Sequence, residues 1–403
     1  MKNILILISA LLAVACNTAP PPVSIPAPED VVMYQVNPRN FAPENSFKAV
    51  DARLDAIRDL GTNVVWFMPI CEIGVEKAVR SPYCVKDYRA VNPEFGTLDD
   101  FSVFLAEAHD QGFKVILDWV ANHTSPDHPW VTEKPADWYY RDSLGHTIVE
   151  YDWTDIAKLN YGRPEVGEAM RDCMRFWVKR GVDGFRCDVA YQVPQEFWEA
   201  TIPVLREEAG RELYFLAEGE ETWLHDAGFD ATYAWKLHHL LNDIAQSKAD
   251  GDSLARYVAW NAETYPANAK RLSFTSNHDE NSWSGTEFER MGDAWKAMTV
   301  LCWTLPESQP LIYTGQEIGW DHRFEFFEKD PVPTLSWKAN DYTEFYEYLT
   351  GLRHDHPALD PASSFKLLSV SPESISYRRR AGRDRVTVKV DLVAPWSYSI
   401  DCK

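Results

Sequence analysis

Short apolar runs alternate with amphipathic segments along most of the chain, which is the pattern of a parallel sheet whose strands are connected by helices. Because strands of such a sheet are buried on both faces, they read as continuous hydrophobic stretches. Runs of this kind occur at residues 31–36, 63–69, 114–119, 182–188, 213–218, 228–233, 271–276 and 310–314, the sixth being the weakest. These strand–helix units predict an α/β fold, a closed (β/α)8 TIM barrel.

Local signals mark two helix boundaries between these runs. Leu54, Ile57 and Leu60 recur on one helical face, and Gly61 follows them as a stop signal. Thr97 and Asp100 have the spacing of a capping box, with Asp in place of the usual Glu. One helix is therefore expected to end at Gly61 and another to begin after Thr97.

Two segments depart from the strand–helix alternation. The connection at about 121–162, after the third strand, is the longest without a helical pattern, and such a long loop in a compact domain is usually functional. After a last helix near 342–354, alternating segments at 365–370, 375–377 and 386–390 predict short strands. We therefore expect a catalytic barrel at 31–357, with a loop minidomain at about 121–162, and a small C-terminal β domain at 358–403.

The first residues have the pattern of an export signal. Lys2 precedes an apolar run at 4–14 that is too short to span a bilayer, and the run ends in Ala13-Val14-Ala15-Cys16. Two readings are open, plain A-x-A cleavage or a lipoprotein signal with Cys16 acylated; the Pro-rich stretch that follows favours the second. We predict a signal peptide at 1–15, a tether at 16–30, and an exported bacterial lipoprotein, periplasmic or at the cell surface, that reaches the membrane only through Cys16.

Export would place the chain in an oxidising compartment, where disulfides form. Cys71 and Cys84 flank one loop and are the expected disulfide pair, whereas Cys173 and Cys302 fall in helical patterns and are expected as core thiols. The sequence holds no C-x-x-C pair or histidine cluster that would indicate a structural metal.

The amino-acid composition indicates which kinds of molecule the protein can bind. The formal net charge is −21, which argues against nucleic acid or an anionic membrane as an electrostatic partner and suits a neutral substrate. The chain has 16 Trp and 18 Tyr, and aromatic faces are the usual platforms for sugar rings, although packing accounts for most of them. Four aromatic residues of the connection at about 121–162 would either bind sugars away from the cleavage site or pack that segment: Trp138, Tyr139, Tyr140 and Trp153. Trp283 lies on a loop at the expected catalytic face.

Candidate catalytic groups stand at the carboxyl ends of four predicted strands, which meet at one rim of a barrel. They are Asp118, Asn122 and His123, then Arg186 and Asp188, then Glu218, and finally His278 and Asp279. Arg186 and Asp188 share one strand face, so the guanidinium is expected to lower the pKa of Asp188 and keep it ionised, as a nucleophile requires; taken alone, such a pair is more often structural. Glu218 follows an apolar strand with no adjacent cation, so burial should raise its pKa, as a proton donor requires.

The segments 118–123, 184–188, 215–218 and 274–279 resemble, in order, the four signature regions of the α-amylase family, glycoside hydrolase family 13. Residues 61–66 and 313–317 resemble the family's second-strand and eighth-strand motifs, and residues 83–88 resemble the loop whose first tyrosine stacks on the sugar at the cleavage site. The resemblance covers about 31–357.

The resemblance implies a retaining glycoside hydrolase that cleaves α-glucosidic bonds in starch-like α-glucans or maltooligosaccharides. Asp188 would form the covalent glycosyl-enzyme, Glu218 would act as acid and base, and Asp279 would grip sugar hydroxyls. Tyr83, His123, Arg186 and His278 would bind the same sugar, and Asp118 and Asn122 would shape the site. In retaining enzymes the two reacting carboxyl groups are about 5–5.5 Å apart.

Departures from the family pattern leave alternatives open. The run 189–192 stands where many members carry a Lys-His pair that helps a calcium site; the chemistry needs no cofactor, and a structural calcium ion, if bound, would use Asn122. Val189 after the nucleophile resembles the α-1,6-specific enzymes, so an α-1,6-glucosidase or a glucan transglycosylase is the alternative, and a non-catalytic glycan-binding homologue is a further one. We expect a monomer that binds α-glucan and no nucleic acid.

Overall fold

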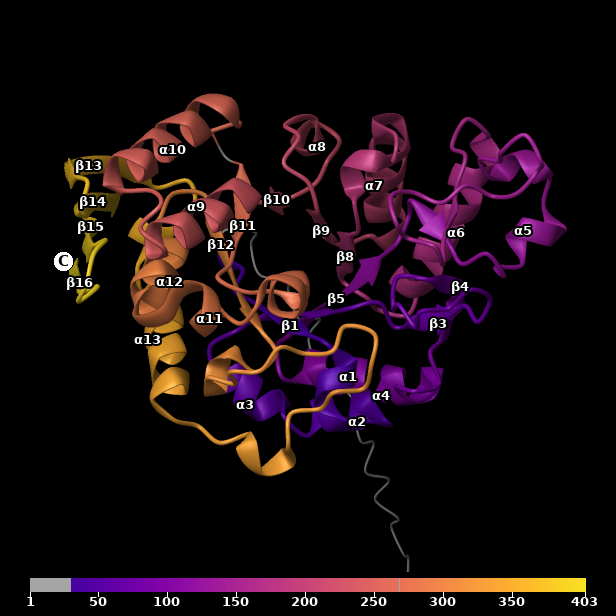
Figure 1. Ribbon diagram of the computed structural model, residues 1–403, viewed down its shortest axis with the longest axis horizontal. Helices are drawn as coiled ribbons and strands as arrows, with labels where there is room; N and C mark the ends of the chain where they lie inside the picture. Colours follow the sequence, from indigo (N-terminus) through magenta and orange to yellow (C-terminus); the bar gives the residue numbers. More distant parts are fainter. Residues whose placement is uncertain (1–29, 268) are drawn as a thin grey trace, which may run out of the picture.

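A computed structural model describes residues 30–267 and 269–403 (Figure 1). Its centre is a closed barrel of parallel strands in the order β1-β12-β11-β10-β9-β8-β5-β2. Their bounds are β1 Met33–Val36, β2 Val64–Phe67, β5 Lys114–Trp119, β8 Gly184–Cys187, β9 Tyr214–Ala217, β10 Ala231–Tyr233, β11 Lys270–Ser273 and β12 Ser308–Tyr313. The predicted fold class is confirmed, and each apolar run supplies one strand.

Helices surround this barrel and connect its strands (Figure 1). The predicted capping box is present, since the Thr97 side chain accepts from the backbone N–H of Asp100 at the start of α4, and Gly61 follows α3 with a φ of +80°, which an L side chain rarely adopts. The helices are α1 Pro38–Phe41, α2 Ser46–Asp51, α3 Leu54–Asp59, α4 Leu98–Asp110, α5 Trp130–Glu133, α6 Pro164–Val178, α7 Gln195–Ala209, α8 Trp223–Asp226, α9 Trp235–Ala245, α10 Gly251–Thr264, α11 Glu287–Met291, α12 Trp295–Thr304 and α13 Asp341–Asp355.

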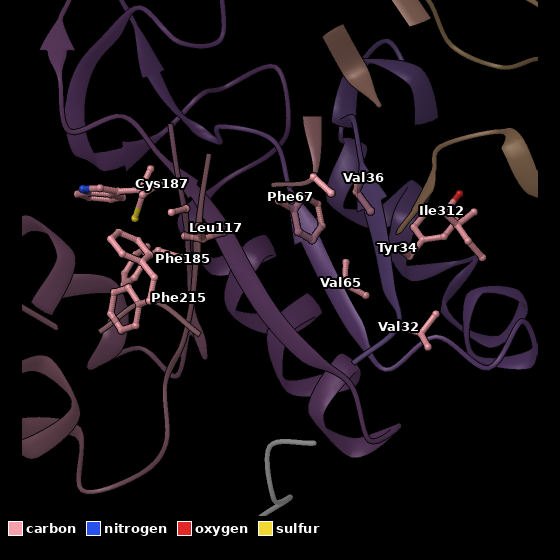
Figure 2. Close-up of a cluster of buried hydrophobic side chains, with 14 of the residues drawn as sticks. Val32, Tyr34, Val36, Val65, Phe67, Leu117, Phe185, Cys187, Phe215 and Ile312 are labelled. Carbon is pink, nitrogen blue, oxygen red and sulfur yellow. The ribbon is translucent and has the colours of Figure 1, made fainter. Parts of the chain in front are cut away.

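Alternation along each strand divides the core into two layers. One layer lies between the strands and the helices and includes Val32, Tyr34, Val36, Val65, Phe67, Leu117, Phe185, Phe215 and Ile312 (Figure 2). The other fills the barrel interior, with Met33, Val64, Trp66, Ile116, Tyr214, Leu216, Tyr233, Leu272 and Leu311. Both faces of every strand are thus covered, which explains the unbroken apolar runs.

Two short antiparallel strand pairs connect the loops at the carboxyl rim, and the first pair is a hairpin. β3 (Cys71–Ile73) pairs with β4 (Val85–Val91), and β6 (His123–Thr124) pairs with β7 (Ala157–Lys158). The predicted Cys71–Cys84 disulfide is wrong, because both thiols are free and buried. The β3–β4 register places Cys71 opposite Val91 and Ile73 opposite Val85, so Cys84 lies towards the other end of the hairpin, where its Sγ is 2.9 Å from the Asp155 carbonyl oxygen.

The C-terminal residues form an antiparallel sheet at the edge of the molecule, beside α10 and α12 (Figure 1). Its strands are β13 Ser364–Ser371, β14 Ser374–Ala381, β15 Asp384–Asp391 and β16 Tyr398–Cys402, the last of which the pattern did not predict. The sheet is fixed to α12, where the Tyr377 hydroxyl is 2.6 Å from Thr304 Oγ1 and Arg379 Nη1 donates to the Thr304 carbonyl at 2.9 Å.

The predicted signal peptide, nearly all of the tether and Cys16 lie outside the described residues. Within residues 30–267 and 269–403, none of the helices combines the length and hydrophobicity needed to cross a membrane.

Candidate active site

A cavity of about 480 Å³ opens at the carboxyl ends of the barrel strands. It is lined by the three candidate carboxylates Asp188, Glu218 and Asp279 and by the predicted sugar-binding residues Tyr83, His123 and His278, together with Val79, Ser81, Asp152, Trp153, Thr154, Asp155, Ile156, Val189, Trp283, Phe326 and Phe327. Residues from distant parts of the chain therefore converge on one space. Arg186 and Asp118, which were also predicted, are buried in the barrel; Arg186 contacts both Asp118 and the cavity residue Asp188.

Strand register brings Asp188 beside Glu218. β8 and β9 are neighbours, and their last pairs are Arg186 with Leu216 and Cys187 with Ala217, so the next residue on each strand is one of these carboxylates. The Glu218 backbone N–H donates to the Cys187 carbonyl at 3.0 Å and continues the pairing. Gly184 allows the close approach of the strands, because a Cβ there would lie 1.9 Å from the Tyr214 carbonyl oxygen.

Arg186 connects three carboxylates and a phenol from within the barrel. Its Nη1 donates to Asp118 Oδ1 at 2.8 Å and to Asp188 Oδ1 at 3.0 Å, and its Nε donates to the Tyr233 hydroxyl at 3.0 Å. Its Nη2 lies 3.0 Å from Glu218 Oε2. The arginine side chain is completely buried, so a single cation compensates several carboxylates that have left water.

Two electrostatic predictions need correction. Burial raises the pKa of Asp188, and Arg186 opposes that rise without reversing it, so the predicted lowering is wrong. The pKa of Glu218 is raised by burial, as predicted, but the expectation that no cation lies nearby is wrong, because Arg186 reaches it from the adjacent strand. Burial likewise raises the pKa of Asp118 to about 7 and, with repulsion from Glu218, raises the pKa of Asp279.

The carboxyl groups of Asp188 and Glu218 both contact the Arg186 guanidinium. Burial and the Asp188 charge raise the pKa of Glu218, and Arg186 opposes that rise. Two neighbouring carboxyl groups whose titrations influence each other are an arrangement that acid–base catalysis uses.

The backbone at Val189 contributes a contact that the sequence pattern did not reveal. Val189 has a φ of +37°, in the left-handed region, which a β-branched residue rarely adopts, and its N–H donates to Glu218 Oε2 at 2.8 Å. Strain of this kind costs on the order of 1–3 kcal/mol and gathers at functional sites. The strained turn directly follows the predicted nucleophile, Asp188, and points the Val189 N–H at the Glu218 carboxyl group.

A chain of hydrogen bonds holds the side chains of His278 and Tyr83, which line the cavity, in place. Gln35 Nε2 donates to His278 Nδ1 at 2.7 Å, His278 Nε2 lies 2.6 Å from the Tyr83 hydroxyl, and that hydroxyl donates to Asp118 Oδ2 at 3.0 Å. Burial and the Arg186 charge hold the pKa of His278 well below its usual value, so the ring is neutral. Tyr83 and His278 stack with ring centroids 5.6 Å apart, which presents an apolar face beside the carboxylates.

His123 and Asn122 lie where the insertion joins the barrel. Burial lowers the pKa of His123 to about 4, so it is a neutral hydrogen-bonding group in the cavity. Asn122 Nδ2 donates to Glu150 Oε2 at 2.6 Å, and the other oxygen of Glu150 is paired with the Lys158 ammonium. The Glu150 carboxylate therefore already has an amide N–H and an ammonium as partners, and the described residues contain no group of three or more His, Cys, Asp or Glu able to hold a metal. These contacts do not fit Glu150 as a calcium ligand.

The aromatic residues considered as sugar-binding platforms differ in whether they are buried or line the cavity. Trp138 and Tyr139 are buried and pack the insertion, whereas Trp153 and Trp283 line the cavity. Phe326 and Phe327 also line it and were missed. The signal was present as the run Phe324-Glu325-Phe326-Phe327, but a loop after the eighth strand gives no periodicity by which buried and exposed rings can be told apart.

The fold and the position of the cavity define a (β/α)8 barrel whose site lies at the carboxyl rim, where barrel enzymes carry their chemistry. Residues 35–143 and 133–356 match the family model described as alpha amylase, catalytic domain. The chain belongs to the α-amylase family, as the four sequence segments indicated.

Individual relatives agree with this assignment. An α-amylase of Haloarcula japonica is 30% identical over 391 residues, which are 90% of this chain and 55% of that protein. The crystal structure of an α-amylase from Lactobacillus plantarum superposes with a TM-score of 0.81 at 31% identity, covering 90% of this chain and 88% of the other. A maltogenic α-amylase of Thermotoga neapolitana, described as noncanonic, gives a TM-score of 0.82 at 25% identity, covering 90% and 86%. The chain spans only about half the length of the haloarchaeal relative.

Proposed function

We propose that this protein is a retaining glycoside hydrolase that cleaves α-glucosidic bonds in starch-like α-glucans or maltooligosaccharides. The observation that carries the proposal is the convergence of Asp188, Glu218 and Asp279 on one cavity, with Arg186 between the first two. Both carboxyl groups contact one guanidinium, which favours the short separation of retaining enzymes over the roughly 6.5–9.5 Å of inverting ones.

In the proposed reaction a carboxylate oxygen of Asp188 attacks the anomeric carbon while the bond to the leaving oxygen breaks. Glu218 donates its proton to that oxygen; burial and the Asp188 charge raise the pKa of Glu218, as a proton donor requires. Water then attacks the glycosyl ester, its proton passes to Glu218, and the ester bond to Asp188 breaks. Two inversions leave the anomeric configuration as it was.

The surrounding groups would hold the sugar during these steps. Asp279, whose Oδ2 lies 3.3 Å from His278 Nε2, would accept hydrogen bonds from sugar hydroxyls. His123 and His278 are neutral, so they would donate and accept hydrogen bonds and would not add charge next to the developing oxocarbenium ion. The face of Tyr83 supplies the apolar surface on which a sugar ring would stack.

The proposal is tested by Asp188→Asn. We expect the variant to release no reducing sugar from maltoheptaose and to keep the circular-dichroism spectrum and melting temperature of a folded barrel. Asp172→Asn, on the exposed face of α6, is the matched control and should retain full activity. Full turnover by Asp188→Asn would contradict the proposal, and glycan binding without turnover by the wild type would favour a non-catalytic homologue.

The same site chemistry would serve an α-1,6-glucosidase, or a transglycosylase if a sugar hydroxyl replaced water in the second step. Chromatography of the products from maltotriose, panose and pullulan separates these activities. Longer products from maltotriose would indicate transfer. Maltose with glucose from panose would indicate α-1,6 cleavage, whereas isomaltose with glucose would indicate α-1,4 cleavage.

We further propose that the protein is exported and anchored by acylation of Cys16, on the strength of the sequence Ala13-Val14-Ala15-Cys16 after an apolar run. The full-length protein should then enter the detergent phase of a Triton X-114 extraction, and Cys16→Ser should move it to the aqueous phase. Recovery of both proteins in the aqueous phase would contradict the anchor.

A further inference from the structure

Two loops meet on one side of the cavity and line it with aromatic rings. Val79, Ser81 and Tyr83 belong to the loop before β4, and Phe326 and Phe327 belong to the loop after β12. The rings of Tyr83 and Phe326 lie 6.2 Å apart with planes at 18°, and Trp283 lies 5.1 Å from Phe326 and 5.7 Å from Phe327. We call the set Tyr83, His278, Trp283, Phe326 and Phe327 the aromatic wall.

Charged groups fasten the two loops to each other behind the aromatic wall. Arg39 is 3% exposed, and its Nη1 donates to the carbonyl oxygens of Arg80 at 2.7 Å and Phe327 at 3.2 Å. The Arg80 side chain is paired with Glu328 on the other loop, and Glu94 lies 3.1 Å from Arg39 and 3.6 Å from Arg80. A buried guanidinium that binds both backbones holds the loops in contact, which a rim ion pair alone would not do.

With Glu218 as the proton donor, the aromatic wall would lie on the side of the cavity away from the leaving group. Glu218 must reach the glycosidic oxygen, so the departing part of the chain extends past Glu218 and its neighbour Val189. The sugar attacked by Asp188 then lies towards Tyr83, His278 and Asp279. Any further sugar at the non-reducing side of that ring would have to pass Phe326, where the two loops touch.

We infer that the aromatic wall and the Arg39–Arg80–Glu328 contacts close the cavity beyond the cleaved sugar, so that the enzyme acts on the non-reducing ends of α-glucans and not on internal bonds. This inference rests on the proposed function and adds to it which bonds are cut. The cavity volume of about 480 Å³ lies in the lower part of the range of about 300–1,000 Å³ for small-ligand sites, in agreement with a short pocket.

The test compares p-nitrophenyl α-maltoheptaoside with the same compound carrying an acetal on its non-reducing end. Wild-type kcat/KM should be at least about 10-fold lower for the blocked compound, because the acetal would clash with the aromatic wall. Phe326→Ala should raise kcat/KM on the blocked compound about 10-fold, with a smaller change on the open one, since it removes the clash. Glu328→Gln should shift the ratio in the same direction. Arg175→Gln, which breaks an exposed ion pair between α6 and α7, is the control and should leave the ratio unchanged.

Equal cleavage of the blocked and open compounds by the wild type would overturn the inference while leaving the proposed function intact. A proportional loss on both compounds in Phe326→Ala would also overturn it, because Phe326 would then be a platform for a second sugar. Absence of cleavage of either compound by the wild type would remove the proposed function and the inference together.

Discussion

Replacing Arg186 by lysine tests the arrangement of charges on which the site depends. Arg186 contacts Asp118, Asp188, Glu218 and Tyr233 from three different nitrogens, and a lysine ammonium offers one nitrogen at a single point. The positive charge would be kept, but at least two contacts to charged groups would be lost. At about 1.5–3 kcal/mol for each, Arg186→Lys should lower the free energy of unfolding by roughly 3–6 kcal/mol.

The loss of unfolding free energy in Arg186→Lys should also depend on pH. Burial raises the folded-state pKa values of Asp188 and Glu218, so the folded protein binds more protons than the unfolded chain between the ordinary and the raised values. Their contribution to stability is therefore present at low pH and is lost as pH rises through the raised values. Because a lysine would oppose that rise less well, the deficit of Arg186→Lys should be larger at about pH 8 than at about pH 5.

Urea denaturation, followed by circular dichroism at both pH values, measures the free energy of unfolding of the wild type and of Arg186→Lys. Arg175→Lys is the control, because Arg175 pairs with the half-exposed Asp172 and Glu208 and such pairs contribute at most about 1 kcal/mol. The reasoning would be refuted if Arg186→Lys destabilised the protein no more than the control, or equally at the two pH values.

Two further predictions concern the acid and the insertion. Glu218→Gln should lower kcat/KM on maltotriose by about 10²–10⁴-fold but much less on dinitrophenyl α-glucoside, whose leaving group needs no proton; equal losses on the two substrates would contradict the acid role. Chelation with EDTA should leave the melting temperature unchanged, because the Lys158 ammonium and not a metal pairs with Glu150, whereas Lys158→Met should cost about 1–3 kcal/mol by leaving that carboxylate without its cation. A lower melting temperature in EDTA would contradict this assignment.

Much of the barrel could be predicted because its signals are local and repeated. The run 114–119 became β5 with the expected bounds, and Thr97 with Asp100 capped α4 as their spacing indicated. The convergence of Asp188, Glu218 and Asp279 followed from their positions at strand ends, since barrel closure brings those ends together.

Features set by register and by loop contacts could not be predicted. The β3–β4 register separates Cys71 from Cys84, although both flank the same loop. No local pattern shows that the Arg186 side chain reaches Glu218 on the next strand, and burial outweighs the cation in setting the pKa of Asp188. Phe326 meets Tyr83 through two loops that are remote in sequence, and no local pattern encodes that contact.

The most direct measurement of the central claim is the identification of the residue that carries the sugar during turnover. The protein would be incubated with 5-fluoro-α-glucosyl fluoride, which slows hydrolysis of the glycosyl-enzyme, and digested for peptide mass spectrometry. The account predicts a single glycosylated peptide with the sugar on Asp188, and no label in Asp188→Asn. A sugar found on another carboxylate, or steady hydrolysis of the reagent with no labelled peptide in the wild type, would contradict it.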